Sequence, residues 1–267
     1  MSKLHPREAA MQTLPLSSPG EQLKTTLDRE GFVVIPQFLD AEELDELRTN
    51  LDRYIRDVVP GLPDAEAFYE DRSRPATLKQ LQRMGRDPFF AEYTRHPRWC
   101  SVAETLLGEA AVAEEPEWFN KPPGTNHVTP PHQDNYYFCL TPPRVLTIWL
   151  ALDDVDAENG CLRYVAGSHT QGFRTHARSS ILGFSQGITD YSPDDFRREI
   201  AVPLRAGDAV AHHGMTIHRA DANHSCERHR RSFALVFKGV SCRRDEAAFA
   251  RYQAAAKKQH EQLGLKT

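Results

Sequence analysis

The chain has 267 residues, of which 40% are hydrophobic and 26% charged, a composition typical of globular proteins with a sizeable core. A formal net charge of −4, without any long run of Lys or Arg, argues against nucleic-acid binding. Five scattered cysteines without C-x-x-C spacing argue against a disulfide framework, and no apolar stretch approaches the roughly 20 residues of a membrane span. We therefore expect a soluble, cytoplasmic protein without an obligate protein partner.

The first elements along the chain are predicted to be an arm, a helix and a strand. Residues 1–20 contain several Pro and Ser residues and are expected to form a flexible arm, with residues 21–267 forming one domain. A helix is expected at about 21–30. The apolar run Phe32–Ile35 follows it as a strand, which Pro36 ends.

A second helix is predicted to begin after Asp40. Asp40 and Glu43, three residues apart, are typical of a capping box at a helix N-terminus. Apolar side chains then recur at helical spacing, at Leu44, Leu47, Leu51, Ile55 and Val58. We expect this helix to pack on the outside of a sheet.

From about residue 110 the sequence consists of short β-rich runs separated by Pro, Gly and Asn. Several short strands with turn residues between them favour a sandwich or barrel. Residues 244–258 are again helical by composition. The predicted fold is mainly β, a double-stranded β-helix (jelly-roll or cupin-like) core buttressed by N-terminal and C-terminal helices. The predicted strands are Glu117–Asn120, Asn135–Leu140, Val145–Leu152, Cys161–Val165, Asp208–His212 and Ser232–Phe237.

A candidate metal site lies in this second half. His132 and Asp134 form an H-x-D motif before an aromatic run, and in a strand residues i and i+2 point to the same face. His218, after an apolar stretch, is well placed to be the third ligand. Two His and one carboxylate form the facial triad of non-haem iron(II) oxygenases, which leaves positions open for a 2-oxo acid and O₂. An H-x-D motif alone is weak evidence.

The chain resembles the phytanoyl-CoA dioxygenase family of iron(II)- and 2-oxoglutarate-dependent oxygenases from about residue 23 to about residue 240. Several ordered blocks carry this resemblance: Phe119–Pro123, His132–Asp134, Trp149–Leu152, Asn159–Leu162, Gly167–His169, Gly207-Asp208, His213-Gly214, His218 with Asn223, and Arg230-Arg231. The resemblance implies a jelly-roll fold, with His132, Asp134 and His218 as catalytic iron(II) ligands. It also implies that 2-oxoglutarate and O₂ are co-substrates and that the product is hydroxylated, because the carboxylate ligand is kept.

The resemblance further implies an arginine that binds the distal carboxylate of 2-oxoglutarate. Arg230 lies twelve residues after His218 and is the expected residue, with Arg231 as the rival because successive strand residues face opposite ways. The spacing from Asn223 is one residue longer than the family pattern. The hydroxyl residue usual two positions after the distal His is Ala220 here, so we expect Thr147 to supply the missing hydrogen bond.

Other residues are predicted around the cofactors. Resemblance suggests that Asn120 or Lys121 contacts 2-oxoglutarate or substrate, although a turn Asn and a surface Lys fit the sequence equally well. Trp149 shares a face with Thr147 by alternation and is expected to line the pocket, although core packing also explains it. Gln133 and His213 are expected to support the metal ligands from outside.

The substrate itself is not defined by the sequence. Asn135, Tyr136, Tyr137 and Phe138 are the candidate pocket residues. The segment 171–200, which includes Phe184, is a candidate lid. Its arginines are compatible with an anionic small-molecule substrate, and a solvated surface explains them as well.

Two alternatives remain open from the residues alone. One is a cupin-like isomerase or hydrolase that uses zinc or manganese, since His and Asp ligands do not select iron. The other is a non-catalytic ligand-binding barrel. The expected arginine clamp argues against the first, and the complete set of three ligands argues against the second.

Overall fold

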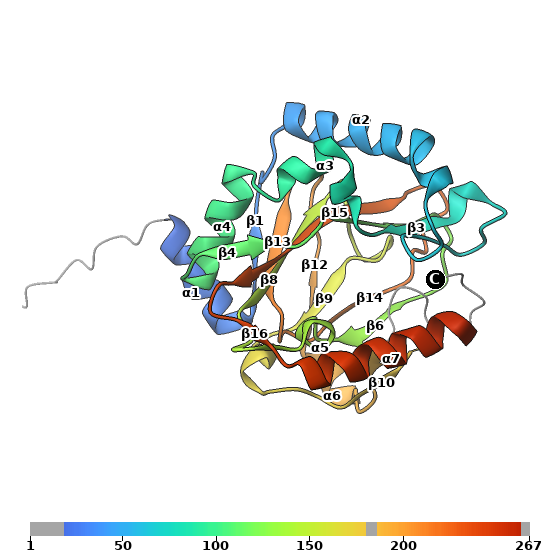
Figure 1. The fold of residues 1–267 in the computed structure, drawn as a ribbon. Helices are drawn as coiled ribbons and strands as arrows, with labels where there is room; N and C mark the ends of the chain where they lie inside the picture. Colours follow the sequence, from blue (N-terminus) through green and yellow to red (C-terminus); the bar gives the residue numbers. More distant parts are fainter. Residues whose placement is uncertain (1–18, 180–185, 263–267) are drawn as a thin grey trace, which may run out of the picture.

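Two antiparallel sheets form the core of the computed structural model, which describes residues 19–179 and 186–262 (Figure 1). The larger sheet has the strand order β1-β13-β8-β15-β5-β3-β2, and β4 pairs with β15. Its strands are β1 (Phe32–Ile35), β2 (Ala67–Tyr69), β3 (Leu78–Leu81), β4 (Ala111–Ala113), β5 (Glu117–Lys121), β8 (Val145–Ala151), β13 (Ala209–His213) and β15 (Arg230–Gly239).

The smaller sheet has the order β12-β9-β14-β6. Buried residues of both sheets, such as Trp149 and Ala234 from one and Tyr164 from the other, pack in one cluster, so the sheets face each other. This arrangement is the predicted jelly roll. The remaining strands are β6 (Thr129–His132), β9 (Leu162–Val165), β12 (Glu199–Val202), β14 (His218–Ala220), and the pairs β10 (His176–Arg178) with β11 (Gln186–Ile188) and β7 (Leu140–Thr141) with β16 (Arg243–Arg244).

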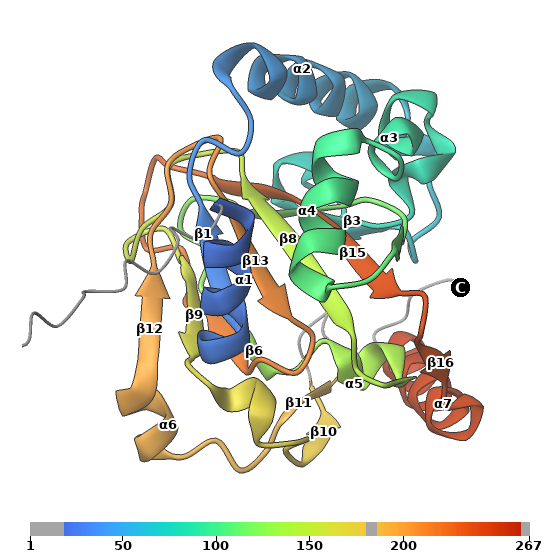
Figure 2. The ribbon, with the colours of Figure 1, turned by 90° about the vertical axis from the view of Figure 1, so that its left-hand side faces the viewer.

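Helices cover the outer face of the larger sheet (Figure 2). Alternation along β8 sends Ile148 outward against them and Thr147 and Trp149 inward. Asp40 caps α2 with the predicted capping box, since its side chain accepts from the backbone of Glu43 and the Glu43 side chain accepts from the backbone of Asp40. The helices are α1 (Pro19–Glu30), α2 (Ala41–Asp57), α3 (Pro88–Tyr93), α4 (Pro97–Leu107), α5 (Asn135–Phe138), α6 (Pro193–Arg198) and α7 (Glu246–Gln262).

One predicted strand is wrong. Residues 135–138 form the short helix α5, with backbone hydrogen bonds from Tyr137 to Asp134 and from Cys139 to Asn135. The buried Asn135 side chain also bonds both backbone groups of Leu140, donating to its carbonyl and accepting from its N–H. These local hydrogen bonds override the β propensity of the aromatic residues.

The two chain ends also differ in part from the prediction. Residues 1–18 of the expected arm lie outside the described residues, while Pro19 and Gly20 belong to helix α1. The C-terminal helix is longer than expected and runs across the end of the sheets next to α5 (Figures 1 and 2). None of the helices in the described part of the chain is long and apolar enough to span a membrane.

Candidate metal centre and cofactor cavity

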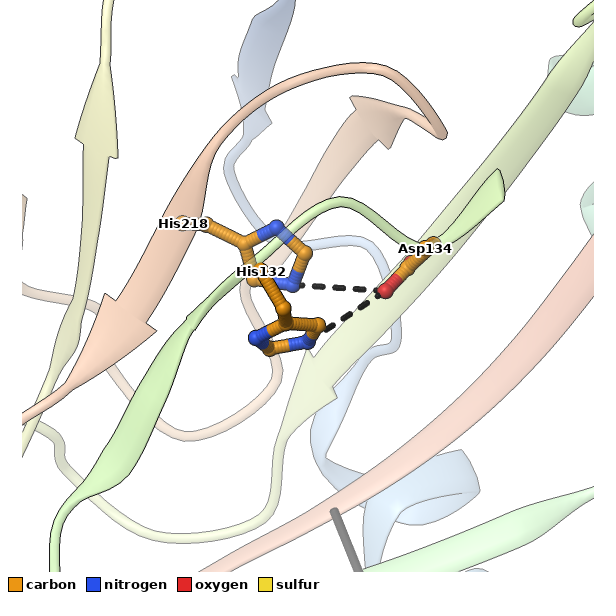
Figure 3. Close-up of side chains that lie close together, drawn as sticks. All are labelled: His132, Asp134 and His218. Carbon is orange, nitrogen blue, oxygen red and sulfur yellow. Dashed lines mark ion pairs between the residues drawn. The ribbon is translucent and has the colours of Figure 1, made fainter. Parts of the chain in front are cut away.

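The three predicted metal ligands come together between the sheets (Figure 3). Register pairing places His132, at the end of β6, opposite His218, at the start of β14. Asp134 lies two residues after His132, in α-helical conformation at the start of α5, so a turn rather than strand alternation brings its carboxylate back toward the two histidines. One ligand atom from each residue lies within 4.8 Å of the others, an arrangement suited to one metal ion.

Backbone carbonyls orient both imidazoles. Nδ1 of His132 lies 2.8 Å from the carbonyl oxygen of Pro130, and Nδ1 of His218 lies 3.0 Å from that of Thr216. Because a carbonyl only accepts, each Nδ1 carries the proton, and each Nε2 presents its lone pair. The two Nε2 atoms lie 3.4 and 3.5 Å from Oδ1 of Asp134. Burial lowers the pKa of His218 well below its usual value, which favours the neutral imidazole that binds metals.

The other carboxylate oxygen of Asp134 is held by the protein. Oδ2 accepts a 2.6 Å hydrogen bond from Thr147 and a 3.1 Å hydrogen bond from Nε2 of His212. Nδ1 of His212 in turn meets the hydroxyl of Tyr164 at 2.9 Å. Burial alone would raise the pKa of Asp134, but its histidine neighbours outweigh this effect and hold the pKa well below the usual range. The Asp134 carboxylate is therefore ionised, and its Oδ1 atom points toward the two histidines.

This hydrogen-bond network corrects two predictions. The supporting histidine is His212 rather than His213, because His213 points to the opposite side of β13, toward His169. Alternation could have found it, since His212 pairs with Thr147 across the sheet on its inner face. The hydroxyl of Thr147 orients Asp134 and is not directed at a 2-oxoglutarate carboxylate. Gln133 does support the site, since its amide bridges the backbone of Met215 and Gly172.

A cavity of about 370 Å³ opens beside the metal cluster. Of the predicted pocket residues, Tyr137 and Phe138 line it, whereas Asn135 does not, since its side chain is completely buried in α5. Tyr136 also faces elsewhere and stacks on His176 at 4.0 Å. No described residue of segment 171–200 lines the cavity, and Phe184 lies outside the described residues.

Arg230 and Arg231 have opposite environments, as strand alternation requires. Arg231 points outward and forms a 2.7 Å ion pair with Asp153. Arg230 is 4% exposed, faces the cavity with its guanidinium 5.5 Å from the ring centroid of Trp149, and has an Nε with no hydrogen-bond partner among the described residues. Burial lowers the pKa of Arg230 to about 10. A buried guanidinium with an unused donor fits a carboxylate ligand at this end of the cavity.

Lys121 and Asn120 both line the same end of the cavity. Nζ of Lys121 donates to the backbone carbonyl of His127 at 3.1 Å, and burial, together with the charge of Arg230, lowers its pKa well below the usual value. The Asn120 amide is committed to the protein, since Nδ2 donates to the carbonyl of Leu78 and Oδ1 meets His229. Lys121 is therefore the better placed of the two to meet an anion.

Comparison with known proteins decides the family. The family model described as Phytanoyl-CoA dioxygenase (PhyH) matches residues 27–232. The chain belongs to the phytanoyl-CoA dioxygenase family. Among curated members, it is 31% identical over 153 residues to the phytanoyl-CoA dioxygenase of Arabidopsis thaliana, covering 56% of this chain and 53% of that protein. It is 30% identical over 156 residues to phytanoyl-CoA dioxygenase domain-containing protein 1 of Danio rerio, again covering 56% and 53%. The chain thus spans about half the length of the curated relatives it matches.

Solved structures of oxygenases share the fold over more of their length. The epimerase SnoN, in complex with Fe³⁺, alpha ketoglutarate and nogalamycin RO, is 25% identical with a TM-score of 0.70, covering 87% of this chain and 88% of that one. EvdO2 from Micromonospora carbonacea var. aurantiaca, complexed with 2-oxoglutarate, is 26% identical with a TM-score of 0.65, covering 86% and 96%. The carbocyclase SnoK from nogalamycin biosynthesis is 26% identical with a TM-score of 0.67, covering 89% and 91%.

Membership in this family, together with the His–Asp–His cluster, gives this chain iron(II) as its metal and 2-oxoglutarate and O₂ as co-substrates. The residues present fit these groups, since two neutral imidazoles and one carboxylate suit iron(II) and a buried arginine suits a dicarboxylate. This finding argues against the cupin-like isomerase or hydrolase considered from the sequence.

Proposed function

We propose that this chain is an iron(II)- and 2-oxoglutarate-dependent dioxygenase that hydroxylates an aliphatic C–H bond of a small-molecule substrate, with release of succinate and CO₂. The observation that supports it best is one continuous cavity that joins the His132–Asp134–His218 cluster to the Nε of Arg230, which has no hydrogen-bond partner in the described part of the chain. A metal cluster alone would suit several metals and reactions. The buried guanidinium of Arg230 in the same cavity favours an anionic co-substrate in addition.

In this proposal His132, Asp134 and His218 hold iron(II), and the side chains behind them fix their geometry. Thr147 and His212 keep the carboxylate of Asp134 turned toward the histidines. Bound iron(II) supplies the activation of O₂, coupled to decarboxylation of 2-oxoglutarate.

The side chains at the Arg230 end would bind the co-substrate. Arg230 binds the distal carboxylate of 2-oxoglutarate, Trp149 packs beside the guanidinium, and Lys121, which pairs with Arg230 across the two strands, lies next to it in the cavity wall. Asn120 holds β5 and His229 in place around them. Tyr137 and Phe138 stand on the substrate side of the cluster and exclude water from it.

The experiment is anaerobic addition of iron(II) and 2-oxoglutarate to the apoprotein, read as the visible charge-transfer band of bidentate 2-oxoglutarate on iron. We expect a band in the wild type that weakens in Asp134→Ala and in Arg230→Ala. Succinate release in air then reports turnover. The absence of a band, with zinc or manganese retained at stoichiometry, would contradict the proposal.

The outcome of the oxidation needs its own measurement, because SnoN is described as an epimerase and SnoK as a carbocyclase. Once a substrate is found, product mass distinguishes the outcomes. A gain of one oxygen atom supports hydroxylation, whereas an unchanged mass or the loss of two hydrogens identifies epimerisation or ring closure.

A further inference from the structure

The cavity is also lined by the carboxylate of Glu117, which the proposed mechanism does not use. Glu117 lies on β5 and lines the cavity, while the next residue, Trp118, packs outward into the helix-covered core. Strand register places Glu117 opposite Ala234, which itself pairs with Trp149. Glu117 therefore belongs to the inner row of side chains but is not part of the metal cluster.

No ion pair involves Glu117 among the residues that the structure describes, although five Lys and Arg side chains line the same cavity. Lys238 pairs with Glu114, and the guanidinium of Arg244 lies 4.1 Å from the ring centroid of Phe249. The hydrogen-bonding neighbour of Glu117 is Gln80, while burial and the charge of Asp134 raise the pKa of Glu117 to about 7. The protein thus leaves this carboxylate with capacity to accept a further hydrogen bond.

Aromatic side chains line the same cavity. Tyr137 and Phe138 come from α5, and Phe249 and Tyr252 come from the C-terminal helix α7. The rings of Tyr137 and Tyr252 meet edge to face with centroids 5.7 Å apart, and Phe249 lies 6.1 Å from Tyr252. Helix α7 therefore supplies part of the cavity wall. Such rings favour a substrate with a ring or another apolar body.

We propose that Glu117 and these four aromatic residues form the substrate subsite, which binds an apolar, ring-bearing molecule through a hydrogen-bond donor, either a hydroxyl or an amine. The proposal rests on the proposed function, because it assigns the substrate side of the same cavity. An anionic substrate is disfavoured at this position, because its carboxylate would lie next to the carboxylate of Glu117.

Three probes of matched size test the proposal: 2-phenylethanol, 2-phenylethylamine and phenylacetate. Each is titrated anaerobically into protein loaded with iron(II) and 2-oxoglutarate. Binding is followed by calorimetry and by the change it causes in the charge-transfer band. We expect the alcohol or the amine to bind at least about tenfold more tightly than phenylacetate, the size of one hydrogen bond to a charged group.

Variants test whether Glu117 causes the tighter binding of the alcohol or the amine relative to phenylacetate. Glu117→Ala should abolish the difference between the donors and phenylacetate. Glu117→Gln should keep the preference for the alcohol, because its amide oxygen still accepts, and lose any preference for the amine. Tyr252→Ala should weaken all three probes, and Glu104→Gln, an exposed carboxylate on α4, serves as the matched control.

The outcomes separate this proposal from the proposed function. The band before any probe is added tests iron and 2-oxoglutarate loading, and its absence would contradict the proposed function alone. With the band present, three results overturn the subsite: tightest binding of phenylacetate, a donor preference that survives in Glu117→Ala, or no binding of any probe.

Discussion

The two faces of the larger sheet are built from the same strands but carry different chemistry. On β8, the outward Ile148 is fully buried among apolar side chains beneath the helices, whereas the neighbouring Thr147 faces the cavity and bonds Asp134. On β15, Phe233 packs outward, whereas Arg230 lies inside with an Nε that no other described residue bonds. Helix packing thus supplies the stability that allows unpaired polar groups to be held on the other face. Variants on the two faces should therefore separate loss of function from loss of stability.

The largest functional effect is expected for Asp134→Ala on the cavity face. It removes the one carboxylate of the metal cluster, so succinate release should fall by more than about 100-fold, beyond the range seen for outer-shell residues. The melting temperature should also fall modestly, because Thr147 and His212 lose their buried acceptor, so turnover is compared at a temperature where the variant is folded. Retained turnover in this variant would show that Asp134 does not hold the metal.

The largest stability effect is expected for Ile148→Ala on the helix face. Truncating a fully buried side chain leaves a cavity and should lower the free energy of unfolding by about 2–4 kcal/mol. Chemical denaturation measures this loss. The affinity for 2-oxoglutarate, titrated by the charge-transfer band on folded protein, should remain that of the wild type. A large change in this affinity would argue against the separation of the two faces.

A smaller functional effect, on the affinity for 2-oxoglutarate, is expected from a matched pair of arginine variants. Arg230→Met should weaken 2-oxoglutarate binding by about 100-fold, because it removes charged hydrogen bonds to a carboxylate. Arg231→Met breaks the surface pair with Asp153 and should change that affinity by less than about twofold. Titration of the band compares the two variants. The reverse order would assign the clamp to Arg231.

The smallest predicted change concerns the hydrogen bond behind the metal ligand. Thr147→Val is nearly isosteric but leaves Oδ2 of Asp134 with only His212, so iron(II) affinity should fall by about tenfold. Thr147→Ser keeps the hydroxyl and should stay closer to the wild type. Competition with a metal chelator measures both. Equal affinity in all three proteins would show that the hydroxyl does not tune the metal site.

Regular patterns made much of this structure predictable. The strands of the jelly roll follow from alternating or continuous apolar runs, and the start of α2 follows from its capping box. The three clustered residues and the choice of Arg230 were predicted mainly from the resemblance to the family, and the structure brings the three residues together. Strand alternation separates Arg230 from Arg231, but it does not describe Asp134, which lies in a helical turn.

The features that were missed depend on contacts between distant segments. The helix at 135–138 is held by the Asn135 side chain, which bonds the backbone of Leu140, and by the Asn135 backbone N–H, which donates to the distant Gly214; no propensity reveals these bonds. Glu117 lines one cavity together with Phe249 and Tyr252 of α7, which follow it by more than 100 residues. Residues that meet only in the folded protein leave no periodic pattern in the sequence.

The buried guanidinium of Arg230 has a thermodynamic consequence for the whole protein. A ligand that binds only the folded state adds RT ln(1 + [L]/Kd) to stability, or about 2.7 kcal/mol at a concentration of 100 Kd. Because the dicarboxylate would neutralise a charge that the fold has already desolvated, it would act as a folding ligand as well as a co-substrate. The concentration of 2-oxoglutarate around the protein would then affect its stability as well as its turnover.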